Sequence, residues 1–359
     1  MNPSVGSGRR FAEAWRVRKQ SAQKPKEERF LVAPWNQATF WILNLLWFKA
    51  GQGKLLERIF AKVFLRVFRC WISMILRNGA FVIARLHGSL LTLRMDHRLP
   101  QILAYAPRFN EPLSLVANSL TCQGRDISVI DVGANIGDTV ALIEKSSQGH
   151  AQYLCIEPNQ EFFRLCVHNL RAIPKVQVLS AVIGDRTDAD VKLVEHRPGT
   201  ASARVPTRDD QPVENVFKVV RLDSVAMHWV SKRGLDLIKC DTDGFDFPVL
   251  RSAAALLDLY HPSILFEWHP DLWISAGEDP TGIFEYLFQH GYRNLVFFTN
   301  QGQFFCATSL NDETLFNGLK DLCLARNRID DMHFDVLAAD EKICKIVVEK
   351  STFLIGEPD

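Results

Sequence analysis

After residue 128 the hydrophobic positions alternate between short apolar runs and stretches with helical spacing. Such alternation predicts βαβ units and an α/β fold around a mostly parallel sheet. Strands are expected at 128–132, 152–156, 176–182, 235–240, 263–267, 294–298 and 303–307. Helices are expected near 138–146, 160–171, 246–258, 281–290 and 311–325, and residues 191–222 predict a surface excursion.

The chain before this region has a different pattern. Residues 35–48 are rich in Trp, Phe, Ile and Leu but are too few to span a bilayer. Residues 54–76 predict an amphipathic helix, in which basic residues recur every fourth position beside a wide apolar face. The helix either lies on an anionic membrane or packs against the main fold or a second protomer. We favour packing, because most amphipathic helices pack against protein.

These patterns divide the chain into three parts. Residues 1–30 hold eight Lys or Arg against three acids and predict a mobile basic tail. Residues 31–78 form an N-terminal helical segment, and residues 79–359 form the main domain.

The composition of the chain excludes some classes of partner and compartment. The net charge of +1 argues against nucleic acid as the main partner. The eight cysteines are scattered without a C-x-x-C pair, which favours buried reduced thiols. The first thirty residues lack the apolar core of a secretory signal. We therefore expect a cytoplasmic protein, at the inner face of the membrane if the basic helix binds lipid.

The stretch 129–138 is the centre of the predicted site. An apolar run ends at Asp131, passes through a turn with Gly133 and Gly137, and opens into a helix. Glycine allows the backbone to approach a ligand closely. Ligands of open α/β sheets bind at the carboxyl ends of the strands, where this turn lies.

Two further acids follow strand ends. Glu157 ends the second strand, where a carboxylate accepts hydrogen bonds from two ribose hydroxyls. Asp185 follows the third strand and is placed to reach an adenine amino group, although an ordinary turn aspartate fits nearly as well.

The first turn discriminates between cofactors. Nicotinamide-dependent oxidoreductases need G-x-G-x-x-G for the pyrophosphate, whereas Asn135 occupies the middle glycine position here. Asp131 and Asp138 would repel a pyrophosphate but suit a cationic amino-acid group. S-adenosylmethionine, which carries an ammonium, a sulfonium and a ribose, fits this set of groups.

Several motifs in this order resemble the FkbM-type family of S-adenosylmethionine-dependent methyltransferases over roughly residues 80–310. They are D-V-G-A-N-I-G at 131–137, E-P-N at 157–159, L-D at 222–223, D-L-I-K-C-D-T-D-G-F at 236–245, V-L-R at 249–251 and I-L-F-E at 264–267. The resemblance implies a class I, Rossmann-like methyltransferase domain with a seven-stranded, mostly parallel sheet, its last strand antiparallel and helices on both faces. It also implies methyl transfer, usually to a hydroxyl of a sugar or small metabolite. A common family form has Glu where this chain has Asp243.

Carboxylates cluster after the fourth strand, at Asp241, Asp243 and Asp246. We expect Asp241 and Asp243 to position the acceptor hydroxyl, act as base or hold a divalent cation. Asp246 precedes Phe-Pro and fits a helix start equally well.

The fifth strand ends with Glu267 and His269 on one side, since residues two apart share a face. His269 is the expected general base, because an imidazole titrates near neutral pH. Trp268 and Trp273 either stack on a sugar ring or belong to the core.

Two rival functions stay open: a nicotinamide-dependent oxidoreductase on a similar sheet, and a membrane-associated scaffold that no longer turns over. The identity of the acceptor and the oligomeric state do not follow from these residues.

Overall fold

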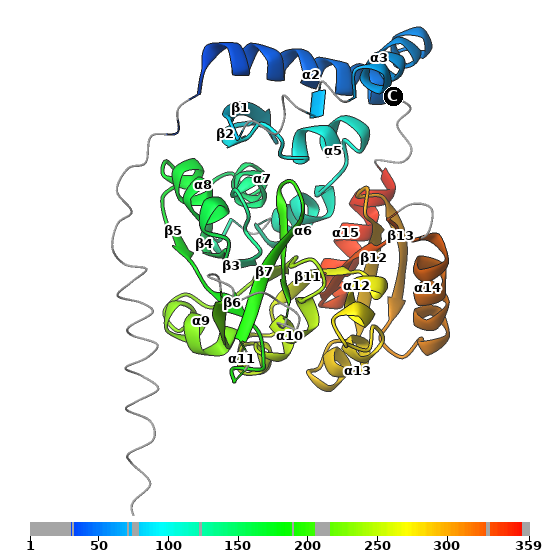
Figure 1. Cartoon of the computed structure of the whole chain (residues 1–359). Coiled ribbons are helices and arrows are strands. Elements are labelled where there is room, and N and C mark those ends of the chain that lie inside the picture. Colours follow the sequence, from blue (N-terminus) through cyan, green and yellow to red (C-terminus); the bar gives the residue numbers. More distant parts are fainter. Residues whose placement is uncertain are drawn as a thin grey trace, which may run out of the picture.

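The computed structural model describes residues 30, 32–69, 72–73, 79–121, 124–188, 190–204, 216–327 and 331–353. Its central sheet has eight strands in the order β13-β12-β14-β11-β10-β3-β4-β5 (Figure 1). The strands are β3 (Ile127–Val132), β4 (Ala151–Ile156), β5 (Val176–Leu179), β10 (Leu237–Cys240), β11 (Ser263–Trp268), β12 (Asn294–Thr299), β13 (Phe304–Ser309) and β14 (Phe334–Ala339).

The pairing of the strands matches the arrangement that the resemblance implies. Strands β5, β4, β3, β10 and β11 are parallel, and β14 is antiparallel to both β11 and β12. With β12, these strands give the implied seven-stranded arrangement, in which the last strand of the chain, β14, is antiparallel. Six of the seven correspond to predicted strands, whereas β14 was not predicted and the strand predicted at 303–307 is β13. The eighth, β13, extends the edge by an antiparallel hairpin with β12.

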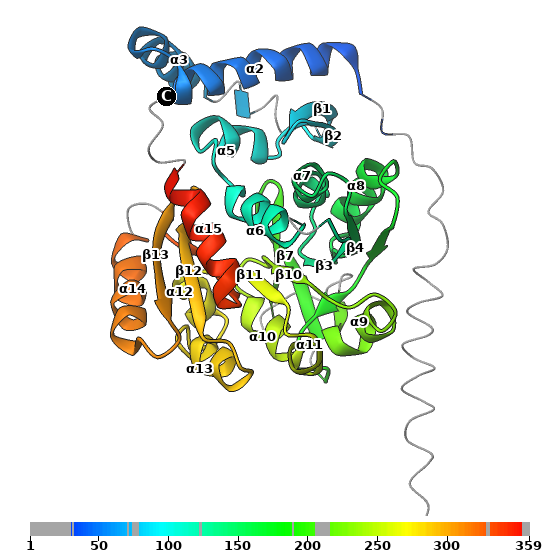
Figure 2. The ribbon, with the colours of Figure 1, turned by 180° about the vertical axis from the view of Figure 1, so that it is seen from behind.

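Helices cover both faces of the sheet because successive strand residues point to opposite sides. One face carries α6 (Glu111–Thr121), α7 (Asp138–Ser146), α8 (Gln160–Leu170) and α15 (Glu341–Phe353) (Figure 2). Alternate strand residues such as Val129 and Tyr153 pack in one core cluster with these helices. Residues such as Ile130 and Leu154 face the other layer. That layer contains α9 (Leu222–Val230), α10 (Asp246–Arg251), α11 (Ala254–Tyr260), α12 (Pro270–Ser275), α13 (Gly282–Gln289) and α14 (Glu313–Arg326). Both faces of the central strands are therefore buried, as their continuous apolar runs predict.

A separate layer lies above the sheet and its helices. It contains α2 (Pro34–Gln52), α3 (Leu55–Val67), the hairpin β1 (Phe81–Leu86) and β2 (Ser89–Arg94), and α5 (Leu99–Tyr105) (Figure 1). Its apolar side chains join Ala141 of α7 and Phe162 of α8 in one core cluster. Within the described residues, no helix combines the length and apolar character needed to cross a bilayer.

The predicted surface excursion at 191–222 contributes most of a second, smaller sheet. Its order is β6-β9-β7-β8, built from β6 (Val182–Ile183), β7 (Asp190–Arg197), β8 (Thr200–Arg204) and β9 (Val216–Val220). Strands β7 and β8 form an antiparallel hairpin whose tip carries Pro198 and Gly199.

Most predicted elements of the main fold are present. The helix at 246–258 is two helices, α10 and α11, because the chain turns at residues 252–253. The predicted third strand at 176–182 stops at Leu179, and Val182 belongs to the smaller sheet instead. The helix predicted at 54–76 is described as α3, and residues 70, 71 and 74–76 lie outside the described residues, as does the tail up to residue 29.

The turn after β3 brings two loops into van der Waals contact. Gly133 has φ +82°, and a Cβ added to it would lie 1.9 Å from the Asp241 carbonyl oxygen. Only glycine combines this backbone conformation with this approach. The packing of the first turn against the loop after β10 therefore depends on Gly133.

We expect Gly133→Ala to lower the free energy of unfolding more than Gly234→Ala does. Gly234 has φ +80° with nothing within 4 Å of an added Cβ, so it reports only the left-handed strain, about 1–2 kcal/mol. The clash at Gly133 should add about 1–3 kcal/mol, as overpacking usually does. Denaturant unfolding measures both variants, and equal losses would contradict the close approach.

Candidate functional site

A cavity of about 480 Å³ opens at the carboxyl ends of the parallel strands. It lies where open α/β sheets bind ligands and is large enough for a drug-sized molecule. Its walls include residues that follow β3, β4, β10 and β11, part of α5, and the tip of the β7–β8 hairpin. The acids that line it are Asp138, Glu157, Asp241, Asp243, Glu267, Asp271 and Asp331, and the permanent cations are Arg98 and Lys239.

Lys239 joins the two loops beneath this cavity. Its side chain is buried, and Nζ lies 3.4 Å from Asp131 Oδ1 and 3.4 Å from Asp241 Oδ2. The same ammonium donates a hydrogen bond of 3.2 Å to the Gly133 carbonyl. Burial lowers the pKa of Lys239, but the surrounding acids, Asp241 first, outweigh it and raise the pKa above its ordinary value. Lys239 therefore stays charged.

Asp131 lies behind the wall of the cavity. It is fully buried, it does not line the cavity, and Oδ2 accepts a hydrogen bond from the Thr139 hydroxyl. The register pairs it directly with Lys239 on the neighbouring strand. Its charge is therefore compensated within the protein.

Glu157 does line the cavity, at the tip of β4. Oε2 accepts the Asn135 N–H at 2.8 Å, and Oε1 accepts the Asn159 N–H at 2.8 Å. Burial raises the pKa of Glu157 to about 7, and the two backbone hydrogen bonds oppose that rise. A carboxylate has about four acceptor positions, so two are left for a ligand diol.

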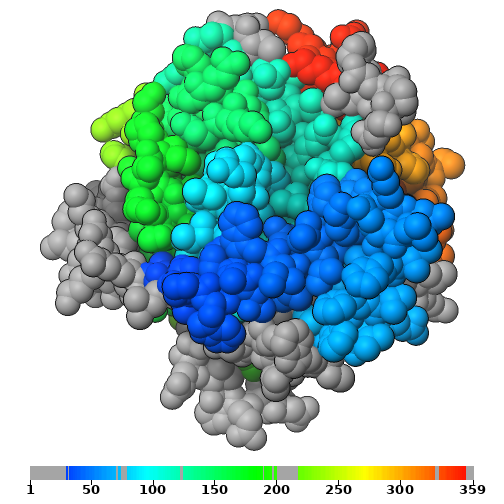
Figure 3. Space-filling view, turned by 90° about the horizontal axis from the view of Figure 1, so that it is seen from above, coloured from blue at the N-terminus to red at the C-terminus, as the bar shows by residue number. Residues whose placement is uncertain are grey.

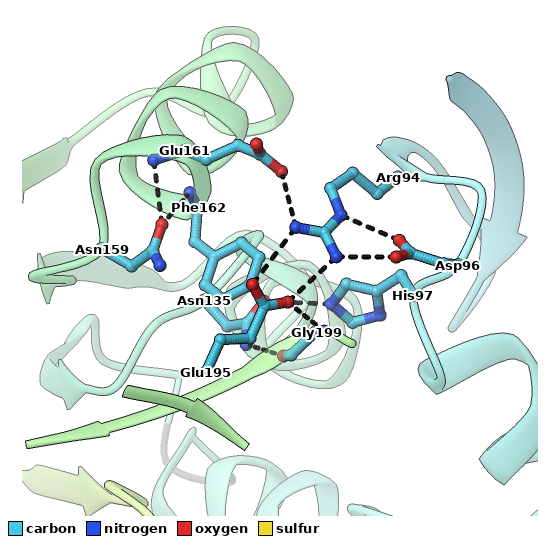
Figure 4. A network of polar contacts seen from close by, with 9 residues as sticks. All are labelled: Arg94, Asp96, His97, Asn135, Asn159, Glu161, Phe162, Glu195 and Gly199. Carbon is cyan, nitrogen blue, oxygen red and sulfur yellow. Dashed lines mark hydrogen bonds and ion pairs between the residues drawn. The ribbon is translucent and has the colours of Figure 1, made fainter. Parts of the chain in front are cut away.

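Asn135 occupies the turn in the left-handed conformation, with φ +47°. Asparagine tolerates this conformation better than most residues, which explains Asn where dinucleotide enzymes need glycine. Its side chain donates to the Gly199 carbonyl at 2.8 Å, and its Oδ1 lies 3.2 Å from His97 Nε2 (Figure 4). The turn thus joins the upper layer to the tip of the β7–β8 hairpin.

Arg94 strengthens this junction. Its guanidinium contacts Asp96 at 2.7 Å, Glu195 of β7 at 2.9 Å and Glu161 of α8 at 3.4 Å (Figure 4). Three segments far apart in sequence are therefore held around one cation, and each of them also supplies a residue of the cavity lining: His97, Phe162 and Gly199.

The acids after β10 have different environments. Asp241 and Asp243 line the cavity, and Asp243 has φ +52°. This left-handed position suits Asp better than the longer Glu, because a short polar side chain bonds locally. Asp246 is fully buried at the start of α10 and accepts the Thr242 hydroxyl, and burial raises its pKa to about 7. The helix-start interpretation of Asp246 fits this position.

Glu267 and His333 form a close pair at the end of β11. His333 Nδ1 lies 3.1 Å from the Asp331 carbonyl, so it donates there and leaves Nε2 as an acceptor. Nε2 lies 3.2 Å from Glu267 Oε1. Burial and the neighbouring acids raise the pKa of Glu267, whereas burial lowers the pKa of His333 to about 4. Both shifts favour a neutral pair in which the carboxyl proton points at Nε2.

His269 lies beside this pair, with its ring 4.9 Å from that of His333. Its Nδ1 accepts the Leu272 N–H at 3.3 Å and caps α12, and its Nε2 lies 3.1 Å from Asp331 Oδ1. Nε2 therefore carries the proton, and both ring nitrogens have partners.

The structure brings most predicted site residues to one cavity: Gly133, Asn135, Glu157, Asp241, Asp243, Glu267 and His269. Gly137 supports the turn from behind, where an added Cβ would meet Leu170 at 2.8 Å. Asp185 lies off the cavity wall and pairs with Arg251 at 2.6 Å. Trp268 and Trp273 are fully buried in the core, as the second interpretation of these residues has it.

Sequence reasoning missed Lys239, His97 and His333. A lone lysine in the otherwise apolar run L-I-K-C was a usable signal, because a charge in a buried strand needs a partner. His333 precedes β14, which was not predicted, and His97 follows a hairpin with no recognisable motif.

The residues present fit a cationic cofactor with a ribose. The cavity lining has seven acids against two permanent cations, and one of those cations, Lys239, is engaged by Asp131 and Asp241. Glu157 keeps acceptor positions for the ribose diol.

Comparison with known proteins supports the same assignment. Residues 131–294 match the model of the Methyltransferase FkbM domain. No curated protein matches the chain. This family match confirms the predicted family and its cofactor, S-adenosylmethionine.

Solved structures show distant likenesses. An FkbM methyltransferase from Methylobacillus flagellatus is 14% identical with a TM-score of 0.34, covering 54% of this chain and 49% of that chain. A putative caffeoyl-CoA O-methyltransferase from Staphylococcus aureus is 12% identical with a TM-score of 0.33, covering 63% of this chain and 82% of that chain. This chain thus covers about half the length of the FkbM structure, and such distant likenesses carry no conclusion about the acceptor.

The seven-strand arrangement, the glycine turn with its acids and the family match converge: this chain carries a methyltransferase FkbM domain in residues 131–294.

Proposed function

We propose that this protein transfers the methyl group of S-adenosylmethionine to a hydroxyl of a sugar or another small molecule. The observation that carries the proposal is the acidic cavity, with Glu157 at one strand end and the Glu267–His333 pair at another. In the sheet order these strands lie three places apart, about 14 Å at the usual strand spacing. This separation leaves room for a donor and an acceptor between the two groups.

The cofactor supplies a methyl carbon activated by its sulfonium. Glu157 would hold the ribose, and the acids of the cavity would favour the positive end. Asp131 would act indirectly, by fixing Lys239 and the Gly133 turn. Methyl transfer needs mainly the alignment of two reactants and the exclusion of water.

We propose the Glu267–His333 pair as the proton acceptor in preference to His269. Glu267 Oε2 is buried and has no hydrogen-bond partner among the described residues. The acceptor hydroxyl would give its proton to Oε2 while Oε1 passes its own proton to His333 Nε2. Glu267 would stay neutral and His333 would become an imidazolium. The acceptor oxygen would bond to the methyl carbon as the bond from that carbon to the sulfonium sulfur breaks, which would leave the electron pair on a neutral thioether sulfur. His269 would position this pair through Asp331 and α12.

A divalent cation is a second hypothesis for the same place. His269, Asp331 and His333 each offer a ligand atom, and these atoms lie within 4.8 Å of one another. Coordination through His269 Nε2 would require its proton to move to Nδ1, where it would face the Leu272 N–H. A chelator added to the turnover assay tests this hypothesis, and loss of activity restored by a divalent ion would establish it.

Binding of the cofactor should depend on pH. Affinity for S-adenosylmethionine should rise about tenfold from about pH 6 to about pH 8, because Glu157 ionises near 7 and only its charged form accepts both ribose hydroxyls. Glu157→Gln should bind more weakly and lose most of this rise. Calorimetry with the same ligand in both proteins cancels the ligand's own titration. An unchanged affinity in the variant contradicts the ribose assignment, and tighter binding of a nicotinamide cofactor by the parent favours the oxidoreductase alternative.

Turnover should depend on Glu267. A screen of sugars and small hydroxyl compounds with labelled S-adenosylmethionine should identify an acceptor. With that acceptor, Glu267→Gln should lower kcat about 100- to 10,000-fold, the range of general acid–base catalysis, and leave cofactor affinity unchanged.

Asp335→Asn is the matched control. Asp335 pairs with Glu267 across β14 and β11, does not line the cavity, and has a pKa raised by burial to about 7. The control should keep the parent's kcat. Similar losses of kcat in both variants would indicate general damage to the neighbouring strands β11 and β14. Glu267 would then have no part in the proposed proton transfer.

A further inference from the structure

The helix α2 is apolar on two opposite sides. Its inner side places Phe40, Leu43 and Trp47 in the core of the upper layer. Its outer side exposes large apolar side chains, whose exposed fractions lie between 51% and 67%. These outer residues are Trp35, Trp41, Ile42, Leu45 and Phe48.

The helix α3 is exposed over most of its surface. Ala61 is its only fully buried residue, so this helix contributes little to the core. Its exposed apolar side chains are Leu55, Leu56, Ile59, Phe60, Val63 and Val67. Together with Phe68, the outer residues of the two helices make up twelve of the twenty large hydrophobic side chains exposed in the described part of the chain. A concentration of this kind marks an interaction surface.

The charges on α2, α3 and the residues beside them are mostly positive. Residues 32–69 contain six Lys or Arg and a single acid, Glu57. Glu57 is engaged by Lys49 at 2.9 Å and by the Lys54 backbone N–H at 3.1 Å. On α3 the basic residues recur every fourth position, next to the apolar face. In the sequence, residues 1–30 also hold eight basic residues against three acids, and the structure describes only Phe30 of them.

We propose that the outer sides of α2 and α3 form a docking surface for an anionic lipid bilayer. An apolar face with Trp and Phe, edged by Lys and Arg, inserts at the headgroup level and attracts anionic lipids. A second copy of the chain would bring two surfaces of the same positive charge together, which opposes self-association. Figure 3 shows α2 and α3 spread across one face of the molecule, as contact with a flat surface requires.

This proposal stands apart from methyl transfer. The docking surface and the cavity share only the layer beneath α2, where α5 packs on α2 and lines the cavity with Leu99 and Ile102. Lipid binding can therefore be measured without any acceptor.

The test is flotation of the full chain with phosphatidylcholine vesicles, with and without about one third phosphatidylserine. The parent should float with the anionic vesicles and far less with the neutral ones. The double variant Arg58→Gln/Lys62→Gln should weaken binding roughly 30-fold, from a factor of about five for each lost cation. Leu56→Ser/Phe60→Ser, which removes two of the most exposed apolar side chains, should weaken it at least about tenfold.

Matched controls carry the same changes elsewhere. Leu259→Ser/Leu322→Ser removes exposed apolar residues from α11 and α14, and Lys232→Gln/Lys342→Gln removes two exposed cations. Both controls should bind vesicles like the parent. All variants should keep the parent's unfolding midpoint and its affinity for S-adenosylmethionine, so failure here is distinguishable from failure of the proposed function.

Parent binding that is absent, or that the α3 variants leave unchanged, overturns the proposal. Sedimentation velocity tests the alternative occupant, a second copy of the chain, because it measures the oligomeric state. A parent dimer that becomes a monomer in Leu56→Ser/Phe60→Ser, without vesicle binding, would assign the surface to a second copy.

Discussion

The geometry of the site depends on one buried ion pair, between Lys239 and Asp131. Their strands are adjacent and their residues are in register, so the two charges meet inside the sheet. Charges of this kind are costly to desolvate, and removing one partner of such a pair commonly costs about 3–5 kcal/mol. Lys239 also reaches the Gly133 carbonyl and Asp241, which ties both ligand-facing loops to the same ammonium. The pair therefore fixes the cavity floor before any ligand arrives.

The same constraint explains why acids gather here. Lys239 compensates Asp131 from within, but among the described residues no lysine or arginine forms an ion pair with Asp138, Glu157 or Glu267 at the cavity, and burial raises the pKa of each. A folded state that raises a carboxyl pKa loses stability as the pH rises from the unfolded value through the folded one. Near neutral pH a cationic ligand would relieve this cost. The free protein is thus electrostatically prepared for a positive group, which the sulfonium and ammonium of the cofactor provide.

The sequence predicted those elements whose pattern is local. Helix α7 begins and ends at the predicted residues because the glycine turn fixes its start, and β3 differs from its prediction by one residue. Residues that act through distant contacts were harder to predict. Lys239 matters because of its register with Asp131, and His333 matters because β14 inserts between β11 and β12, and no local pattern encodes either fact. The hydrogen bonds of His269 with Leu272 and Asp331, which are our reason for proposing another base, are likewise invisible in the order of residues.

For the N-terminal helices, too, the sequence pattern does not distinguish between two structural roles. An apolar helix that packs on a core and one that faces lipid have the same composition, so the sequence left both interpretations open. In the structure α2 has a side of each kind: Phe40 and Leu43 pack in the core, and Trp41 and Leu45 are exposed on the other side. The inward side is what ties this layer to the rest of the fold, because its core cluster includes Ala141 of α7 and Phe162 of α8, the helices that follow the two cofactor-facing strands. A surface held this firmly to the walls of the cavity would keep the site at a fixed distance from whatever the outer side contacts.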